Sequence, residues 1–189
     1  MKHLLLFIAL TCHLYALDKT DIEKLVSKEH NSSGLLEELK IFPFAREYKM
    51  KMSTRFPKKI DHLDPLVRKA KIIEGKYIVE ETHIETDRVI LDYVHITTYS
   101  KEDQRYKMWL QFTLTIDDEE PLVTIEEFDG IYLEDQKVLS WVQIPNLKRP
   151  GMSSSSILKI KKDSMEWISY FYQRGKLSSI MSGIDIPKK

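Results

Sequence analysis

From residue 45 almost to the C-terminus, apolar and polar residues alternate with a period of two. This is the pattern of β-strands that have one apolar face and one solvated face. The stretch 104–115 is the clearest example, with Trp109 on the more polar face. Its apolar face carries Tyr106, Met108, Leu110, Phe112 and Leu114. The chain therefore has to fold mainly as a β-sheet.

The connections between the expected strands are short and carry turn residues, for example Glu74-Gly75 and Arg174-Gly175. The expected strands are 45–56, 65–73, 76–84, 88–99, 104–115, 121–128, 131–144 with a break, 155–162, 165–173 and 176–184. Such connections leave no room for crossover helices, so consecutive strands should pair as an antiparallel up-and-down meander. Closing the sheet protects its edges, so we predict a barrel of about eight to ten strands over 45–185. A two-sheet sandwich is the alternative.

Residues 17–44 lack this alternation and are expected to form a separate N-terminal helical segment. Thr20 and Glu23 have the spacing of a capping box, and Leu35 to Leu39 predict a second short turn. Both faces of the stretch 88–99 are apolar. We therefore expect the N-terminal helices to cover its outer face.

Residues 1–16 have the pattern of a secretory signal peptide. Lys2 supplies a positive charge, an apolar run follows, and cleavage is expected after Ala16. The apolar run is too short to span a bilayer. A lipoprotein signal at Cys12 is the less favoured alternative, because Thr11 fits poorly as the residue before a lipidated cysteine. The sequence thus predicts an exported protein, periplasmic or secreted.

Charge and motif content narrow the classes of function. The chain has 29 basic and 29 acidic residues, and this zero formal charge argues against nucleic-acid binding as the main task. The single cysteine lies in the signal segment, so the mature chain has no thiol. The sequence contains no glycine-rich phosphate loop, nucleophile elbow or metal-binding histidine motif. We predict no catalytic residue, no metal and no cofactor, and favour a non-enzymatic function.

The aromatic residues are the most informative group for function. Trp109, Trp141 and Trp167 each lie in the middle of an expected strand, and Tyr93 and His95 share one face of another. Rings that line a barrel form a pocket for a flat or apolar molecule. These five residues are the predicted ligand-binding set. Two alternatives stay open: rings that only fill the interior of the barrel, and a histidine that only bonds a neighbouring strand.

Short motifs recur in order along residues 66–185. They are Gly75-Lys76-Tyr77, Tyr99 to Trp109, Asp129-Gly130, Trp141, Pro150-Gly151, Trp167 and Gly175-Lys176. In these motifs the chain resembles a bacterial family of exported proteins of unknown function with lipocalin-like (calycin-type) barrels. The resemblance implies that fold but no catalytic residues. That family usually opens its barrel with a Gly-x-Trp strand, whereas residues 46–56 here contain no tryptophan.

These observations lead to ranked hypotheses of function. The first is an exported, non-enzymatic barrel that binds a small hydrophobic or aromatic ligand. The second is a structural or protein-interaction module of the cell envelope with a filled barrel. The third is a haem-binding barrel, with His95, His83 or a tyrosine as axial ligand. An enzyme ranks fourth.

Overall fold

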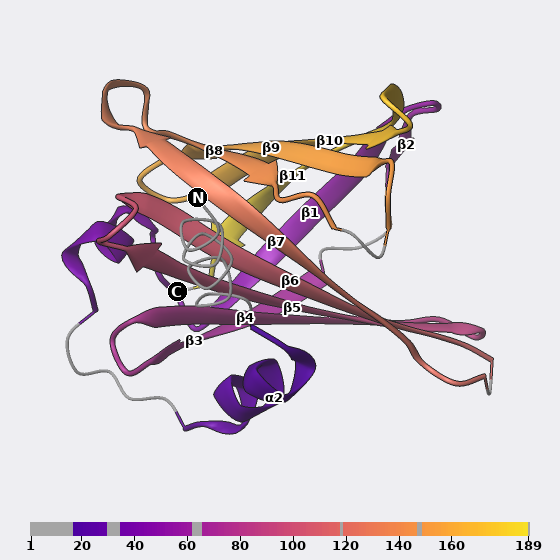
Figure 1. Ribbon diagram of the computed structural model, residues 1–189, viewed down its shortest axis with the longest axis horizontal. Helices are drawn as coiled ribbons and strands as arrows, with labels where there is room; N and C mark the ends of the chain where they lie inside the picture. The colour runs from indigo at the N-terminus through magenta and orange to yellow at the C-terminus, as the bar shows by residue number, and fades with distance from the viewer. Residues whose placement is uncertain (1–16, 30–34, 62–65, 118, 147–148, 189) are drawn as a thin grey trace, which may run out of the picture.

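The computed structural model describes residues 17–29, 35–61, 66–117, 119–146 and 149–188. The expected signal segment, with Cys12 and Ala16, lies outside the described residues. The strands form a single closed, antiparallel barrel (Figure 1). They are β1 Glu47–Phe56, β2 Ile60–Asp61, β3 Leu66–Ile73, β4 Tyr77–Glu85, β5 Val89–Ser100, β6 Arg105–Ile116, β7 Leu122–Leu133, β8 Val138–Gln143, β9 Met152–Ile160, β10 Met165–Gln173 and β11 Lys176–Pro187.

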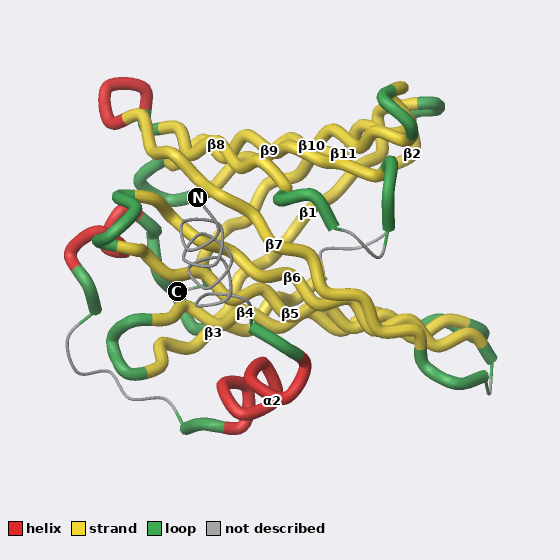
Figure 2. Tube along the Cα trace, in the orientation of Figure 1, coloured by secondary structure: helices red, strands yellow, loops and turns green. Residues whose placement is uncertain are grey.

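From β3 to β11 each strand pairs with its neighbour in the chain, and β3 also pairs with β1. The barrel closes where β1 pairs with β11, from Tyr48 opposite Pro187 to Phe56 opposite Ile180. The two-residue strand β2 pairs with Ser53 and Thr54, in the C-terminal half of β1. The predicted up-and-down barrel is confirmed, and the sheet is one closed surface rather than a two-sheet sandwich (Figure 2).

Two hairpins use the turn residues that the sequence indicated. Glu74 and Gly75 have φ values of 55° and 65°, and Arg174 and Gly175 have 50° and 73°. A β-turn whose two central residues both have positive φ matches the twist of antiparallel strands. These turns fix the register of β3 with β4 and of β10 with β11.

The predicted break near Gly130 is wrong, because β7 continues through this glycine to Leu133. Gly130 pairs with Trp141 of β8, and a Cβ atom at Gly130 would lie 2.6 Å from the Trp141 ring. The glycine is therefore a packing requirement of the strand and not its end. The turn comes later, in the short 3-10 helix η2 Glu134–Gln136.

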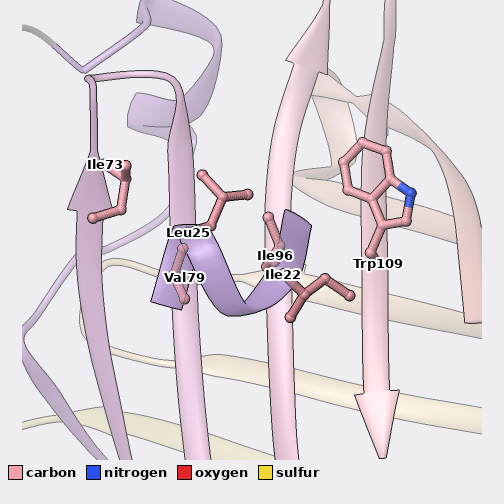
Figure 3. Close-up of a cluster of buried hydrophobic side chains, with 6 residues drawn as sticks. All are labelled: Ile22, Leu25, Ile73, Val79, Ile96 and Trp109. Carbon is pink, nitrogen blue, oxygen red and sulfur yellow. The ribbon is translucent and has the colours of Figure 1, made fainter. Parts of the chain in front are cut away.

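Helix α2, Lys19–Ser27, covers part of the outside of the barrel. Its capping box is formed by Asp18 and Asp21 instead of the expected Thr20 and Glu23, so the helix begins one position earlier than Thr20. Figure 3 shows Ile22 and Leu25 of this helix over the sheet. The buried sheet residues in this cluster are Ile73, Val79, Ile96 and Trp109. None of the helices in the described ranges is both long and apolar enough to cross a membrane.

A second N-terminal element, the 3-10 helix η1 Glu37–Ile41, closes one end of the barrel. Its Leu39 is completely buried and packs in one cluster with Tyr106 and Trp141. The hydroxyl of Tyr106 donates a hydrogen bond to the Glu38 carbonyl at 2.8 Å. Burial raises the pKa of this hydroxyl to about 12, so it stays a donor. The strand ends near η1 are thus sealed by apolar side chains.

Candidate functional site

The barrel encloses a cavity of about 330 Å³. All ten barrel strands contribute to its wall, and Phe42, just after η1, lies at the sealed end. Near that end Tyr48 and Trp141 are almost fully buried, whereas Met52, Phe171 and Met181 at the other end are only partly buried. The cavity therefore opens away from η1.

Four of the five predicted site residues line this cavity: Tyr93, His95, Trp141 and Trp167. The fifth, Trp109, is contradicted as a cavity residue, because it is buried on the outer face in one cluster with Ile22 and Leu25 of α2 (Figure 3). The physical reason is strand alternation: its neighbours Met108 and Leu110 line the cavity, so the residue between them points outward.

Two tryptophans in the wall each pack over a glycine of the adjacent strand. Trp141 faces Gly130, and Trp167 faces Gly183. A Cβ atom at Gly183 would lie 2.5 Å from the Trp167 ring and 2.6 Å from the backbone oxygen of Lys51. Because these indoles occupy the space of a missing side chain, each ring lies close to the sheet. This packing leaves the centre of the barrel less crowded.

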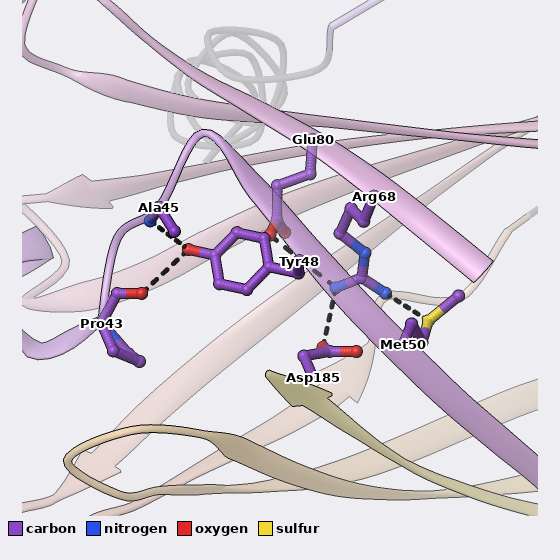
Figure 4. Close-up of polar contacts among 7 residues, drawn as sticks. All are labelled: Pro43, Ala45, Tyr48, Met50, Arg68, Glu80 and Asp185. Atoms are coloured by element: carbon purple, nitrogen blue, oxygen red, sulfur yellow. Dashed lines mark hydrogen bonds and ion pairs between the residues drawn. The ribbon is translucent and has the colours of Figure 1, made fainter. Parts of the chain in front are cut away.

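A cluster of charged residues lies in the cavity wall, on β3, β4 and β11. Arg68 Nη1 is 3.0 Å from Asp185 Oδ2 and 3.7 Å from Glu80 Oε1. Its Nη2 donates to the sulfur of Met50 at 3.0 Å (Figure 4). The three charged side chains are only 10 %, 2 % and 14 % exposed for Arg68, Asp185 and Glu80. Opposite charges thus meet inside an otherwise largely apolar barrel.

Burial is the main influence on the ionisation of both carboxyls. It raises the pKa of Glu80 and of Asp185, while the positive charge of Arg68 opposes the shift. Oδ1 of Asp185 and Nε1 of Trp167 are both buried and have no hydrogen-bond partner among the residues that the structure describes. The indole N–H lies near enough to lower the Asp185 pKa, but its geometry falls short of a hydrogen bond. The cluster therefore has unused capacity to accept a proton or a hydrogen bond.

His95 and Glu126 are two further titratable residues of the wall. The His95 side chain lines the cavity and is half-buried there, inside the barrel. Burial, followed by the positive charge of Arg68, lowers the His95 pKa to about 3. The imidazole is therefore neutral near neutral pH. Glu126 is buried and lies 3.3 Å from Nη1 of Arg149, which is outside the cavity wall.

The geometry and the charge define a class of protein: a ten-stranded antiparallel barrel with one sealed end and an internal cavity containing a buried ionic cluster. Comparison with family models, with curated proteins and with solved structures finds no match to this chain.

Proposed function

We propose that this protein is an exported, lipocalin-like barrel that binds one small hydrophobic or aromatic molecule in its interior. The observation that carries the proposal is the cavity of about 330 Å³. An apolar cavity of about 150 Å³ is enough for benzene, and ligand pockets begin at about 300 Å³. The barrel therefore has room for a molecule of about two rings.

The wall toward the open end supports an apolar ligand. It is formed by Met52, Ile84, Phe112, Phe171 and Met181. Methionine side chains adapt to irregular shapes, and aromatic rings provide rigid contact area. Burial of the ligand surface against this wall would supply most of the binding free energy.

Export and family membership have separate support. The signal-peptide pattern of residues 1–16 favours export, and the motifs along 66–185 favour the lipocalin-like family. Amino-terminal sequencing of the protein from its host tests the first point. A chain that begins at Leu17 supports cleavage, and a chain that retains residues 1–16 contradicts it.

The binding proposal is tested with a neutral fluorescent probe, N-phenyl-1-naphthylamine, titrated into the folded protein. We expect saturable binding at one site per chain. Ser156 lines the cavity and hydrogen-bonds Ser169 at 2.7 Å, so Ser156→Phe places a ring in the ligand space. Ser155 is the adjacent residue on β9 and points outward by alternation, so Ser155→Phe is the matched control.

Ser156→Phe should weaken binding by at least about tenfold, whereas Ser155→Phe should bind as the wild type does. Circular dichroism establishes that both variants remain folded. The absence of saturable binding to the wild type, or equal binding by both folded variants, would overturn the proposal.

A further inference from the structure

The ionic cluster has more acid than base. The ionisable residues of the described cavity wall include three carboxyls, Glu80, Glu126 and Asp185, but only one permanent cation, Arg68. Glu126 has its own partner in Arg149. Two carboxyls therefore share one guanidinium. When both are ionised, the cluster has a net charge of −1.

This imbalance bears on the charge of a ligand. Oδ2 of Asp185 and Oε1 of Glu80 lie 3.0 and 3.7 Å from Nη1 of Arg68, so a ligand anion beside this nitrogen would also lie near both carboxylates. Like charges that close together repel where little water is present. A cation would instead neutralise the second carboxylate. The charge distribution thus disfavours an acid head and favours a basic one.

The hydrogen-bonding state of Asp185 agrees with this reading. The residue is 1 % exposed, and no group in the described part of the chain forms a hydrogen bond with its Oδ1. The nearby indole N–H of Trp167 falls short of a hydrogen bond to this carboxyl, so the buried oxygen can still accept from a donor that a ligand supplies. An ammonium group carries three N–H donors and no acceptor, which suits a cluster rich in acceptors.

The polar and apolar parts of the wall are also separated along the barrel axis. Asp185 pairs with Met50 and Met165, in the half of the barrel near η1, whereas Phe171 and Met181 lie toward the open end. A ligand with one basic end and one apolar end would match this order. The basic end would lie deep, and the apolar body would fill the mouth.

We infer that the barrel selects amphiphilic amines, with a positively charged ammonium head beside Asp185 and Glu80 and an apolar body toward the open end. This inference rests on the proposed ligand-binding function. It assigns a specificity that an apolar cavity alone would not have, because an uncharged cavity would reject the cation.

The test compares three probes that share one apolar body: octylamine, octanol and octanoate. Each is titrated against the protein by calorimetry and by displacement of N-phenyl-1-naphthylamine. We expect octylamine to bind at least about tenfold more tightly than octanol, and octanoate to bind most weakly. Asp185→Asn should remove most of the preference for the amine and retain octanol binding.

Glu126→Gln is the control, because it also removes a carboxyl of the wall but leaves the cluster intact. It should keep the amine preference. If Asp185→Asn does not fold, Glu80→Gln serves as the second variant.

The outcomes separate the two proposals. If N-phenyl-1-naphthylamine binds, two results show that the inference is wrong while the binding function stands. One is that octanol or octanoate binds as tightly as octylamine or more tightly, and the other is that none of the three octyl probes binds. If neither the naphthylamine nor any octyl probe binds, the proposed function itself fails. A preference for octylamine that survives in Asp185→Asn and in Glu80→Gln also overturns the inference, since the ionic cluster would not be the source of that preference.

Discussion

Replacing Arg68 by methionine measures how much the attraction between Arg68 and the two buried carboxylates contributes to the free energy of unfolding. The substitution retains an unbranched side chain but removes the cation that pairs with both Glu80 and Asp185. Removing one partner of a buried ion pair typically costs about 3–5 kcal/mol, because the remaining charge is left without compensation. This is a large part of a typical free energy of unfolding of about 5–15 kcal/mol.

The cost should depend on pH with a defined sign. Without Arg68, the carboxyls of the folded variant hold protons to a higher pH than they do in the unfolded chain, where their ordinary pKa values are 4.5 and 3.8. The folded state then binds more protons than the unfolded state. Its stability therefore rises as the pH falls, by up to about 1.4 kcal/mol per pH unit for each proton. The recovery should take place between the raised pKa values of the folded state and the ordinary values of the unfolded chain.

The assay is urea denaturation of variant and wild type, followed by circular dichroism, near pH 7 and near pH 5. Taking the difference between the two proteins at each pH removes effects that they share. Arg88→Met is the matched control, since Arg88 pairs with Asp117 at 2.8 Å on the surface, with side chains 75 % and 48 % exposed. Such exposed pairs contribute about 0–1 kcal/mol. If Arg68→Met costs no more than Arg88→Met, or does not recover in acid, the reasoning is wrong.

Four further outcomes are expected. Gly130→Ala should cost about 1–3 kcal/mol in urea denaturation, because the new methyl would overlap the Trp141 ring at 2.6 Å. Leu25→Ala should cost about 2–5 kcal/mol in the same assay, yet leave probe binding unchanged, since α2 packs outside the barrel. Tyr48→Phe should cost about 1–3 kcal/mol, because its hydroxyl accepts from the Ala45 N–H and donates to the Pro43 carbonyl. NMR titration should show that His95 stays neutral down to about pH 3. Because a histidine in the unfolded chain titrates near 6.5, the free energy of unfolding should decrease as the pH falls from about 6.5 to about 3.

The fold follows from signals that are local in the sequence. Strand alternation and short turns determine an antiparallel meander, and the need to protect sheet edges determines closure. The apolar outer face of the stretch 88–99 correctly indicated a covering element, which is α2. The break assigned to Gly130 failed because its cause is not local: the glycine accommodates a tryptophan of the next strand.

The site was predictable only in part, for a related reason. Strand alternation already indicates that Trp109 points to the opposite face from Met108 and Leu110, which line the cavity. The prediction placed Trp109 in the cavity because it is aromatic and did not take this alternation into account. Arg68 and Asp185 are 117 positions apart in the chain, and they meet only because β1 lies between β3 and β11 in the closed barrel. No spacing motif can reveal a pair that barrel closure creates.

The ionic cluster is difficult to explain by stability alone. Buried ion pairs are often no better than apolar residues of similar volume, because desolvation offsets the attraction between the charges. Here the cluster is also unbalanced, with an unpartnered oxygen on Asp185. A barrel that needed only to be stable could fill the same positions with Leu and Ile, as it does at Leu39 and Ile78. Unbalanced charge beside a cavity is what the proposed recognition of a ligand head group would require.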